Sequence, residues 1–152
     1  MAIQAHKNRV ALSTKRITVL LADDNRLLRA EFRKILERQI DLEVVGEAKN
    51  GLEAVAMVKK LRPEVVLMDV AMPLLNGLQS TCQILKIAPD TKVLVLSAHS
   101  DEAYVVEAVK SGARGYLIKQ TAADNVCSAI RRVQKGNRCF SPSIPNRLHS
   151  PR

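Results

Sequence analysis

Three carboxylates, one hydroxyl and one ammonium stand at the ends of short apolar runs in this 152-residue sequence. In chain order they are Asp23 and Asp24, Asp69, Ser97 and Lys119. Carboxylates gathered within a few ångströms repel one another, so they must either protonate or hold a cation between them. A hard divalent ion such as Mg²⁺ takes one or two carboxylates and keeps several waters. One carboxylate is then left as a nucleophile toward phosphorus, while Mg²⁺, Lys119 and Ser97 can offset the charge that develops on the phosphoryl oxygens.

Each of these residues also has an ordinary structural interpretation. Asp24 or Asn25 could cap the helix that follows the first apolar run. Ser97 alone could make a turn or a cap, and Lys119 alone could be a solvated strand end. Asp69 is harder to explain in this way, because it ends an apolar run in which an unpaired acid is costly to bury. The signal for chemistry therefore lies in the set and its order rather than in any single member.

The apolar runs have the length and the Val, Ile and Leu content of β-strands. They are ITVLLA (17–22), LEVVGEA (42–48), EVVLMD (64–69), KVLVLS (92–97) and GYLIK (115–119). Between the runs, apolar residues recur at helical spacing, which predicts one helix in each interval and one after the last run. The predicted apolar faces are Leu28, Phe32, Ile35 and Leu36; Leu52, Val55 and Ala56; Leu78, Cys82 and Leu85; Val105, Val106, Ala108 and Val109; and Val126, Ala129, Ile130 and Val133.

The alternation of strands and helices predicts an α/β fold with parallel strands joined by helical crossovers. The runs 17–22, 64–69 and 92–97 are nearly continuous in apolar residues, as strands covered on both faces should be. The run 42–48 contains polar residues and the run 115–119 is short, so both suit the edges of the sheet. A five-stranded, doubly wound, flavodoxin-like sheet of order 2-1-3-4-5 places them there. Ligands bind beyond the carboxyl ends of such strands, where the polar residues converge.

The composition is that of a globular domain, with 47% apolar and 26% charged residues, which excludes a chain disordered throughout. No apolar run reaches the roughly 18 residues of a membrane span, and the N-terminus lacks the apolar core of a signal peptide. The cysteines, Cys82, Cys127 and Cys139, are too few for a disulfide scaffold and show no metal-ligand spacing. We therefore expect reduced thiols and a cytoplasmic location.

The net charge of +9 is concentrated at the two ends of the chain. Residues 1–15 and 137–152 each hold three basic residues and no acid, whereas residues 16–136 hold 18 basic and 15 acidic residues. A nucleic-acid-binding domain usually concentrates its basic residues on a folded face. We expect a basic, flexible N-terminal extension at 1–15, a folded domain at 16–136 and a proline-containing linker or tail at 137–152.

Four separated segments, in the right order, resemble the receiver domain of bacterial response regulators, which has the CheY-like fold. They are LLADDN (20–25), VVLMDVAMPLLNG (65–77), VLVLSAH (93–99) and GARGYLIK (112–119). The resemblance covers residues 16–136, the whole of the expected folded domain.

The resemblance implies a role for each residue at the strand ends. Asp69 is the implied phosphoacceptor, Ser97 hydrogen-bonds the phosphoryl group, Lys119 pairs with it, and Tyr116 occupies the aromatic switch position together with Ser97. The implied Mg²⁺ ligands are Asp23, Asp24, Asp69 and the backbone carbonyl of Ala71.

Local features are similar to the receiver subclass that carries a LuxR-type helix-turn-helix domain. These are LRAEFRKILE (28–37), GARGYLIK (112–119) and SPSI (141–144). The resemblance implies a sensor histidine kinase as partner, a homodimer on phosphorylation, and contact with DNA only through an output domain that is absent from this chain. No membrane partner is expected. Gln120 departs from the family pattern, in which proline often follows the lysine.

We expect a phosphorylation-controlled signalling domain that catalyses only its own phosphorylation and dephosphorylation and is otherwise not an enzyme. One alternative is a Mg²⁺-dependent phosphohydrolase with an aspartyl nucleophile, although residue 71 is alanine where such enzymes commonly carry a second aspartate. The other is an independent DNA-binding protein, suggested by a pI near 9.8, although the basic segments lack a helix-turn-helix pattern and interleaved aromatic residues.

Overall fold

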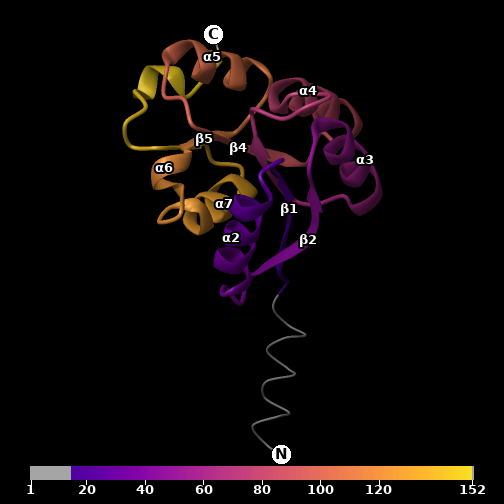
Figure 1. Ribbon diagram of the computed structural model, residues 1–152. Coiled ribbons are helices and arrows are strands. Elements are labelled where there is room, and N and C mark those ends of the chain that lie inside the picture. Colours follow the sequence, from indigo (N-terminus) through magenta and orange to yellow (C-terminus); the bar gives the residue numbers. More distant parts are fainter. Residues whose placement is uncertain (1–14, 152) are drawn as a thin grey trace, which may run out of the picture.

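Strands and helices alternate along the computed structural model, which describes residues 15–151 (Figure 1). The elements are β1 (Ile17–Ala22), α2 (Arg26–Glu37), β2 (Leu42–Ala48), α3 (Gly51–Leu61), β3 (Val65–Asp69), α4 (Gly77–Ile87), β4 (Lys92–Ser97), α5 (Glu102–Lys110), β5 (Gly115–Ile118), α6 (Lys119–Ala122), α7 (Val126–Gln134), β6 (Cys139–Phe140) and the 3₁₀ turn η1 (Asn146–Leu148). The extension predicted at 1–15 lies, apart from Lys15, outside the described residues. Within residues 15–151, no helix is long and apolar enough to cross a membrane.

The sheet is parallel throughout and has the order β2-β1-β3-β4-β5-β6. This confirms the predicted order of the first five strands and the edge position of β2. The prediction that β5 forms the other edge is wrong, because β6 pairs along its outer side. Gly115 permits this approach, since a Cβ at that position would lie 2.2 Å from the carbonyl oxygen of Cys139.

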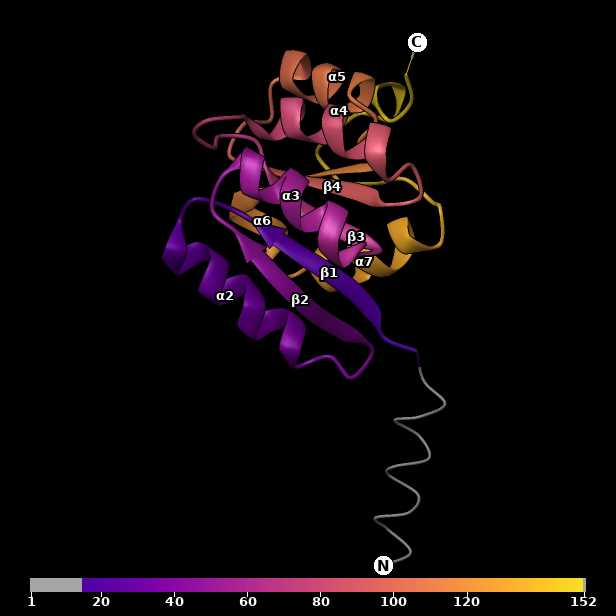
Figure 2. The same cartoon turned by 90° about the vertical axis from the view of Figure 1, so that its right-hand side faces the viewer.

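Helices cover both faces of the sheet, and each face has its own apolar cluster (Figure 2). Helices α2 and α7 pack on one face, and α3, α4 and α5 pack on the other. The predicted apolar faces of α2 and α7 are confirmed by burial of residues such as Phe32 and Ile130.

The predicted face of α3 is wrong, because Ala54 and Val58 are buried while Leu52 is 52% exposed. The start of α3 packs directly on the loop before α4: a Cβ at Gly51 would lie 1.9 Å from the carbonyl oxygen of Leu75. This close approach turns the face that contains Gly51, Ala54 and Val58 toward the core. Cys82, also expected on an apolar face, is exposed.

The segment after α7 docks onto the domain instead of forming the predicted linker or tail. The N–H of Ser141 donates to the carbonyl of Tyr116 at 3.0 Å, and the Ser141 hydroxyl accepts the N–H of Ile118 at 2.8 Å. Ile144 and Leu148 are only 4% and 8% exposed and join the core beside α5. The folded domain therefore continues beyond residue 136, where the sequence predicted its end, because these buried apolar residues extend it through η1.

We predict that Ile144→Ala lowers the free energy of unfolding by about 2–3 kcal/mol, since it removes a buried aliphatic side chain and leaves a cavity. Ile40→Ala is the matched control: Ile40 is 74% exposed, so the change should stay within about 0.5 kcal/mol. Urea denaturation followed by circular dichroism measures both. Equal effects of the two substitutions would show that the segment does not dock.

Candidate functional site

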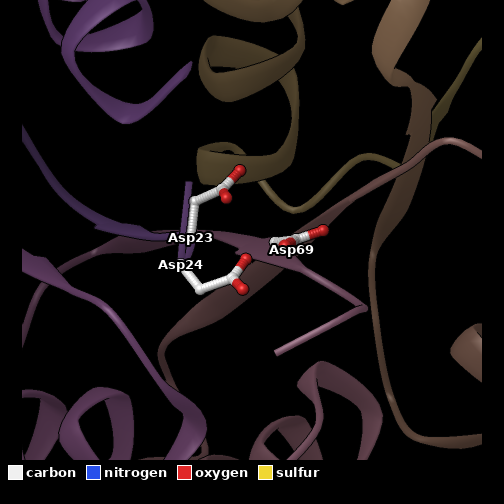
Figure 3. A group of neighbouring side chains, drawn as sticks. All are labelled: Asp23, Asp24 and Asp69. Carbon is white, nitrogen blue, oxygen red and sulfur yellow. The ribbon is translucent and has the colours of Figure 1, made fainter. Parts of the chain in front are cut away.

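Three carboxylates meet at the carboxyl ends of two adjacent strands (Figure 3). Asp23 and Asp24 follow β1, and Asp69 ends β3, which pairs with β1. Oxygens from the three side chains all lie within 4.8 Å of one another. Asp23 and Asp69 are 5% and 2% exposed, whereas Asp24 is exposed. The predicted convergence of these residues on one rim of the sheet is confirmed.

The turn after β1 fixes the carboxylate of Asp23. The N–H of Asn25 donates to Oδ1 of Asp23 at 2.8 Å. Asn25 in turn caps α2, because its side chain accepts the N–H of Leu28 at 3.1 Å. Of the two capping candidates in the sequence, Asn25 is thus the cap, and the carboxylate of Asp24 remains part of the acidic cluster.

Asp69 is held by the loop that follows it. Its Oδ1 accepts the N–H of Ala71 in a long contact of 3.4 Å. The loop then returns close to the strand, where the N–H of Gly77 donates to the carbonyl of Val70 at 2.9 Å. A Cβ at Gly77 would lie 2.1 Å from the carbonyl oxygen of Asp69. Glycine is therefore required for this return, which brings the start of α4 against the backbone of Asp69 and Val70.

Lys119 is the counter-charge of the cluster. Its Nζ lies 2.9 Å from Oδ1 of Asp69 and 3.5 Å from Oδ2 of Asp23. Burial raises the pKa of Asp69 to about 6, with the nearby charge of Asp23 acting in the same direction and Lys119 opposing both. Burial lowers the pKa of Lys119, but its hydrogen bond to Asp69 and the charges of Asp69 and Asp23 outweigh that effect and raise it. Lys119 is thus a firmly charged ammonium.

The donor set fits a hard cation. One ammonium faces three carboxylates, so the cluster keeps an excess of negative charge when these ionise. Oδ2 of Asp23 is buried and makes no hydrogen bond among the described residues, where its contact is the longer ion pair with Lys119 at 3.5 Å. A buried carboxylate oxygen with this little compensation is costly. An oxygen-liganded divalent ion would satisfy this atom and reduce the repulsion.

Ser97 and Tyr116 lie near the cluster's strands but make contacts of their own. Ser97, 1% exposed at the end of β4, accepts the N–H of His99 at 3.0 Å. Tyr116 is fully buried on β5, and its hydroxyl donates to the carbonyl of His99 at 2.7 Å. Burial raises the pKa of Tyr116, with the Ser97 hydroxyl acting in the opposite direction, so the phenol stays protonated and can donate. Among residues 15–151, no hydrogen bond joins Ser97 or Tyr116 to Asp69.

Sequence reasoning missed Arg29 and Glu47. Arg29 donates from α2 to the carbonyl oxygen of Asp23 at 2.7 Å and to Glu47 on β2 at 2.7 Å. Burial raises the pKa of Glu47, but hydrogen bonds from Arg29 and Arg33 outweigh it and hold that pKa below its usual value. The signal was weak: an arginine six residues after Asp23, and one of the two acids, Glu43 and Glu47, in the mixed edge strand.

A parallel doubly wound sheet with an acidic cluster and a lysine at its carboxyl rim is the architecture of a receiver. Residues 19–131 match the response regulator receiver domain family, so the chain belongs to that family.

Relatives and solved structures agree with this assignment. The chain is 38% identical over 137 residues to the transcriptional regulatory protein DegU of Brevibacillus brevis, covering 90% of this chain and 58% of that protein. It is 36% identical over 128 residues to the response regulator protein VraR of Staphylococcus aureus, covering 84% of this chain and 61% of that protein. The chain thus spans about three fifths of the length of these curated relatives.

Two solved structures of response regulators have the same fold. A LuxR-family two-component response regulator from Aurantimonas sp. SI85-9A1 superposes with a TM-score of 0.82 at 28% identity, covering 86% of this chain and 93% of that chain. The isolated receiver domain of RcsB from Salmonella enterica serovar Typhimurium, determined with the phosphomimetic BeF₃⁻, gives a TM-score of 0.79 at 26% identity, covering 88% of this chain and 99% of that one.

In metal-free buffer, Asp69→Asn should stabilise the protein at pH 7. The pKa of Asp69 is about 6 in the folded state against an ordinary value of 3.8. Such a group binds a proton more tightly when folded, so its contribution to stability falls as pH rises from about 4 to about 6. The gain from the substitution should reach up to about 3 kcal/mol at pH 7 and vanish near pH 4.

Chemical denaturation at both pH values measures this gain. Asp90→Asn, in the exposed loop before β4, is the control and should change little at either pH. A gain that is the same at pH 4 and pH 7, or a loss at pH 7, would contradict the burial-driven rise in the Asp69 pKa.

Proposed function

We propose that the chain is a phosphorylation-controlled receiver whose Asp69 accepts a phosphoryl group from a sensor histidine kinase. The observation that carries this proposal is the place of Asp69: it is 2% exposed at the end of β3, paired with Lys119 at 2.9 Å and clustered with two further carboxylates. An isolated buried acid would be costly, and this arrangement offsets that cost with groups that also suit phosphoryl transfer.

The transfer step uses one oxygen of Asp69. Lys119 and the N–H of Ala71 both contact Oδ1, so Oδ2 is the oxygen that neither group holds. A carboxylate oxygen attacks the phosphorus of the kinase's phosphohistidine and forms a P–O bond, while the P–N bond breaks. The imidazole leaves with the electron pair of that bond and takes up a proton. Lys119 offsets the negative charge on the phosphoryl oxygens.

The metal ligands we assign are the carboxylates of Asp23, Asp24 and Asp69 and the backbone carbonyl of Ala71. The buried Oδ2 of Asp23, which makes no hydrogen bond among the described residues, supports this assignment. So do the carboxylate oxygens of the cluster, one from each residue, which lie within 4.8 Å of one another. When bound, Mg²⁺ would neutralise charge on the phosphoryl oxygens. Its small size and preference for oxygen ligands suit a site with few carboxylates.

The switch we assign consists of Ser97 and Tyr116. Ser97 ends β4 next to Asp69, since Asp69 pairs with Leu96 in the sheet, so a small movement of its hydroxyl can reach a phosphoryl group on Asp69. Tyr116 is linked to the backbone of His99, two residues after Ser97. A shift of this loop on phosphorylation would therefore move the hydrogen-bond acceptor of Tyr116, and would alter the surface formed by α5, β5 and α7.

Output would pass through a DNA-binding domain, with phosphorylation changing self-association of the receiver. The relatives named as transcriptional regulators support this role, and two-fold regulators commonly read paired half-sites. The three cysteines are free thiols, which supports a cytoplasmic location. We propose no catalysis beyond the domain's own phosphorylation and dephosphorylation. Ala71, where an aspartyl phosphohydrolase would commonly carry a second acid, supports this choice.

With Mg²⁺ and acetyl phosphate, the wild-type chain should gain the mass of one phosphoryl group, and Asp69→Asn should gain none. Intact-protein mass spectrometry measures the gain. Asp90→Asn removes an exposed carboxylate elsewhere and should behave as the wild type. A phosphoryl mass that persists in Asp69→Asn would refute the assignment of the phosphoacceptor.

Lys119→Ala should keep the fold but uncouple the site from the switch, because Lys119 directly follows β5 and is the group that joins Asp69 to that strand. Beryllium fluoride, a phosphoryl mimic, should shift amide resonances across residues 98–118 in the wild type and much less in Lys119→Ala. Lys86→Ala, on the exposed side of α4, is the control and should respond fully. Shifts as large in Lys119→Ala as in the control would contradict the coupling.

A further inference from the structure

Arg29 joins the acidic cluster to the edge strand of the sheet. From α2, its Nη1 donates to the backbone carbonyl oxygen of Asp23 at 2.7 Å, and its Nε donates to Oε1 of Glu47 at 2.7 Å. The Arg29 side chain is 16% exposed, so both contacts lie largely withdrawn from water. Glu47 carries the opposite charge and is itself held by Arg33. The Arg29 guanidinium is therefore held by Glu47 on β2 while it donates to the carbonyl of Asp23.

Three of the four polar atoms of Asp23 make hydrogen bonds. Its N–H donates to the carbonyl of Ala48 at 2.9 Å, its carbonyl accepts from Arg29, and its Oδ1 accepts the N–H of Asn25 at 2.8 Å. Within residues 15–151, Arg29 is the one side chain that donates to the backbone of Asp23. The fourth is Oδ2, which is buried, makes no hydrogen bond among those residues and lies 3.5 Å from Nζ of Lys119, on the side of the cluster.

We propose that Arg29 is a positioning residue for the cation site, which fixes the direction of Asp23 Oδ2 by holding the carbonyl of the same residue. This inference rests on the proposed function, because it concerns Mg²⁺ binding at the cluster. Arg29 acts through Asp23 and touches no reacting atom. Outer partners that orient a metal ligand typically contribute about 10–100-fold to metal affinity.

Charge and positioning predict changes of opposite sign. The guanidinium is a cation close to a site for a divalent cation, so by charge alone its removal would strengthen Mg²⁺ binding. Pairing with Glu47 reduces that repulsion but does not reverse its sign. Positioning predicts weaker binding, because the carbonyl of Asp23 loses its partner and the carboxylate can turn away. The direction of the change in Kd therefore separates the two effects.

Arg33 supplies a matched control. It lies one turn further along α2, carries the same charge, and pairs with Glu37 and with the other oxygen of Glu47. Its hydrogen bonds within the described residues go to these two acids and not to Asp23. Arg33→Met thus removes a cation and a Glu47 contact near the site without removing the contact to the cluster.

The experiment is Mg²⁺ titration by isothermal calorimetry of the wild type, Arg29→Met, Arg33→Met and Arg29→Lys. We expect Arg29→Met to raise Kd about tenfold and Arg33→Met to leave it within about twofold. Arg29→Lys keeps the charge but cannot reproduce two N–H contacts in fixed geometry, so its Kd should fall between those of the wild type and Arg29→Met. Amide spectra at saturating Mg²⁺ report whether each variant is folded.

A purely structural role would lower the melting temperature of Arg29→Met equally with and without Mg²⁺ and would leave Kd unchanged. That result, or tighter binding in Arg29→Met, would overturn the positioning role while leaving the proposed function intact. Asp24→Ala is included to test the proposed function itself: undiminished Mg²⁺ affinity in that variant, or no binding by the wild type, would overturn the cation site. If Arg29→Met does not fold, Arg29→Lys carries the test, and a Kd equal to that of the wild type overturns the proposal.

Discussion

Repulsion among three carboxylates at the ends of β1 and β3 is the constraint on which the site depends. Their oxygens share a space of less than 5 Å, and two of the three residues are almost fully buried. Lys119 offsets part of this charge from the end of β5, so the β-strands must be in register for the cluster to be tolerated at all. The same unbalanced charge favours a cation at the cluster, as the proposed Mg²⁺ site requires.

Through Lys119 and β5, the site is also linked to the loop after Ser97 and to the C-terminal segment. Lys119 directly follows the strand that contains Tyr116, and the phenol of Tyr116 is bonded to the loop after Ser97. On its outer side the same strand is bonded to Ser141, which belongs to the docked C-terminal segment. The strand that leads into Lys119 is therefore bonded to the loop after Ser97 and to the docked C-terminal segment. This pattern of bonds supports the proposed role of Ser97 and Tyr116 as the switch.

Much of this arrangement could be predicted from the sequence. Continuous apolar runs that end in Asp69 and Ser97 predicted those strand ends, and the run that ends in Lys119 passed the end of β5 by one residue. The alternation of strands and helices and the polarity of the outer runs predicted the order of the first five strands, because these signals are local. Contacts between distant segments were beyond such reasoning. Nothing in the local sequence marks the two-residue β6 as a strand. It forms because Gly115, which lacks a side chain, lets the backbone of Cys139 approach β5, and because Ile144 and Leu148 are buried against the domain. The rotation of α3 and the Arg29–Glu47 pair depend in the same way on which elements become neighbours.

The most direct test of Asp69 as the phosphoacceptor is to locate the phosphoryl group in the wild-type chain. An acyl phosphate is reduced by borohydride to homoserine, whereas free carboxylates are not, so peptide mass spectrometry after phosphorylation and reduction identifies the carboxylate that was modified. We predict homoserine at position 69 and nowhere else, with the yield abolished when Mg²⁺ is chelated before phosphorylation. Homoserine at position 23 or 24, or an undiminished yield at position 69 without Mg²⁺, would contradict it.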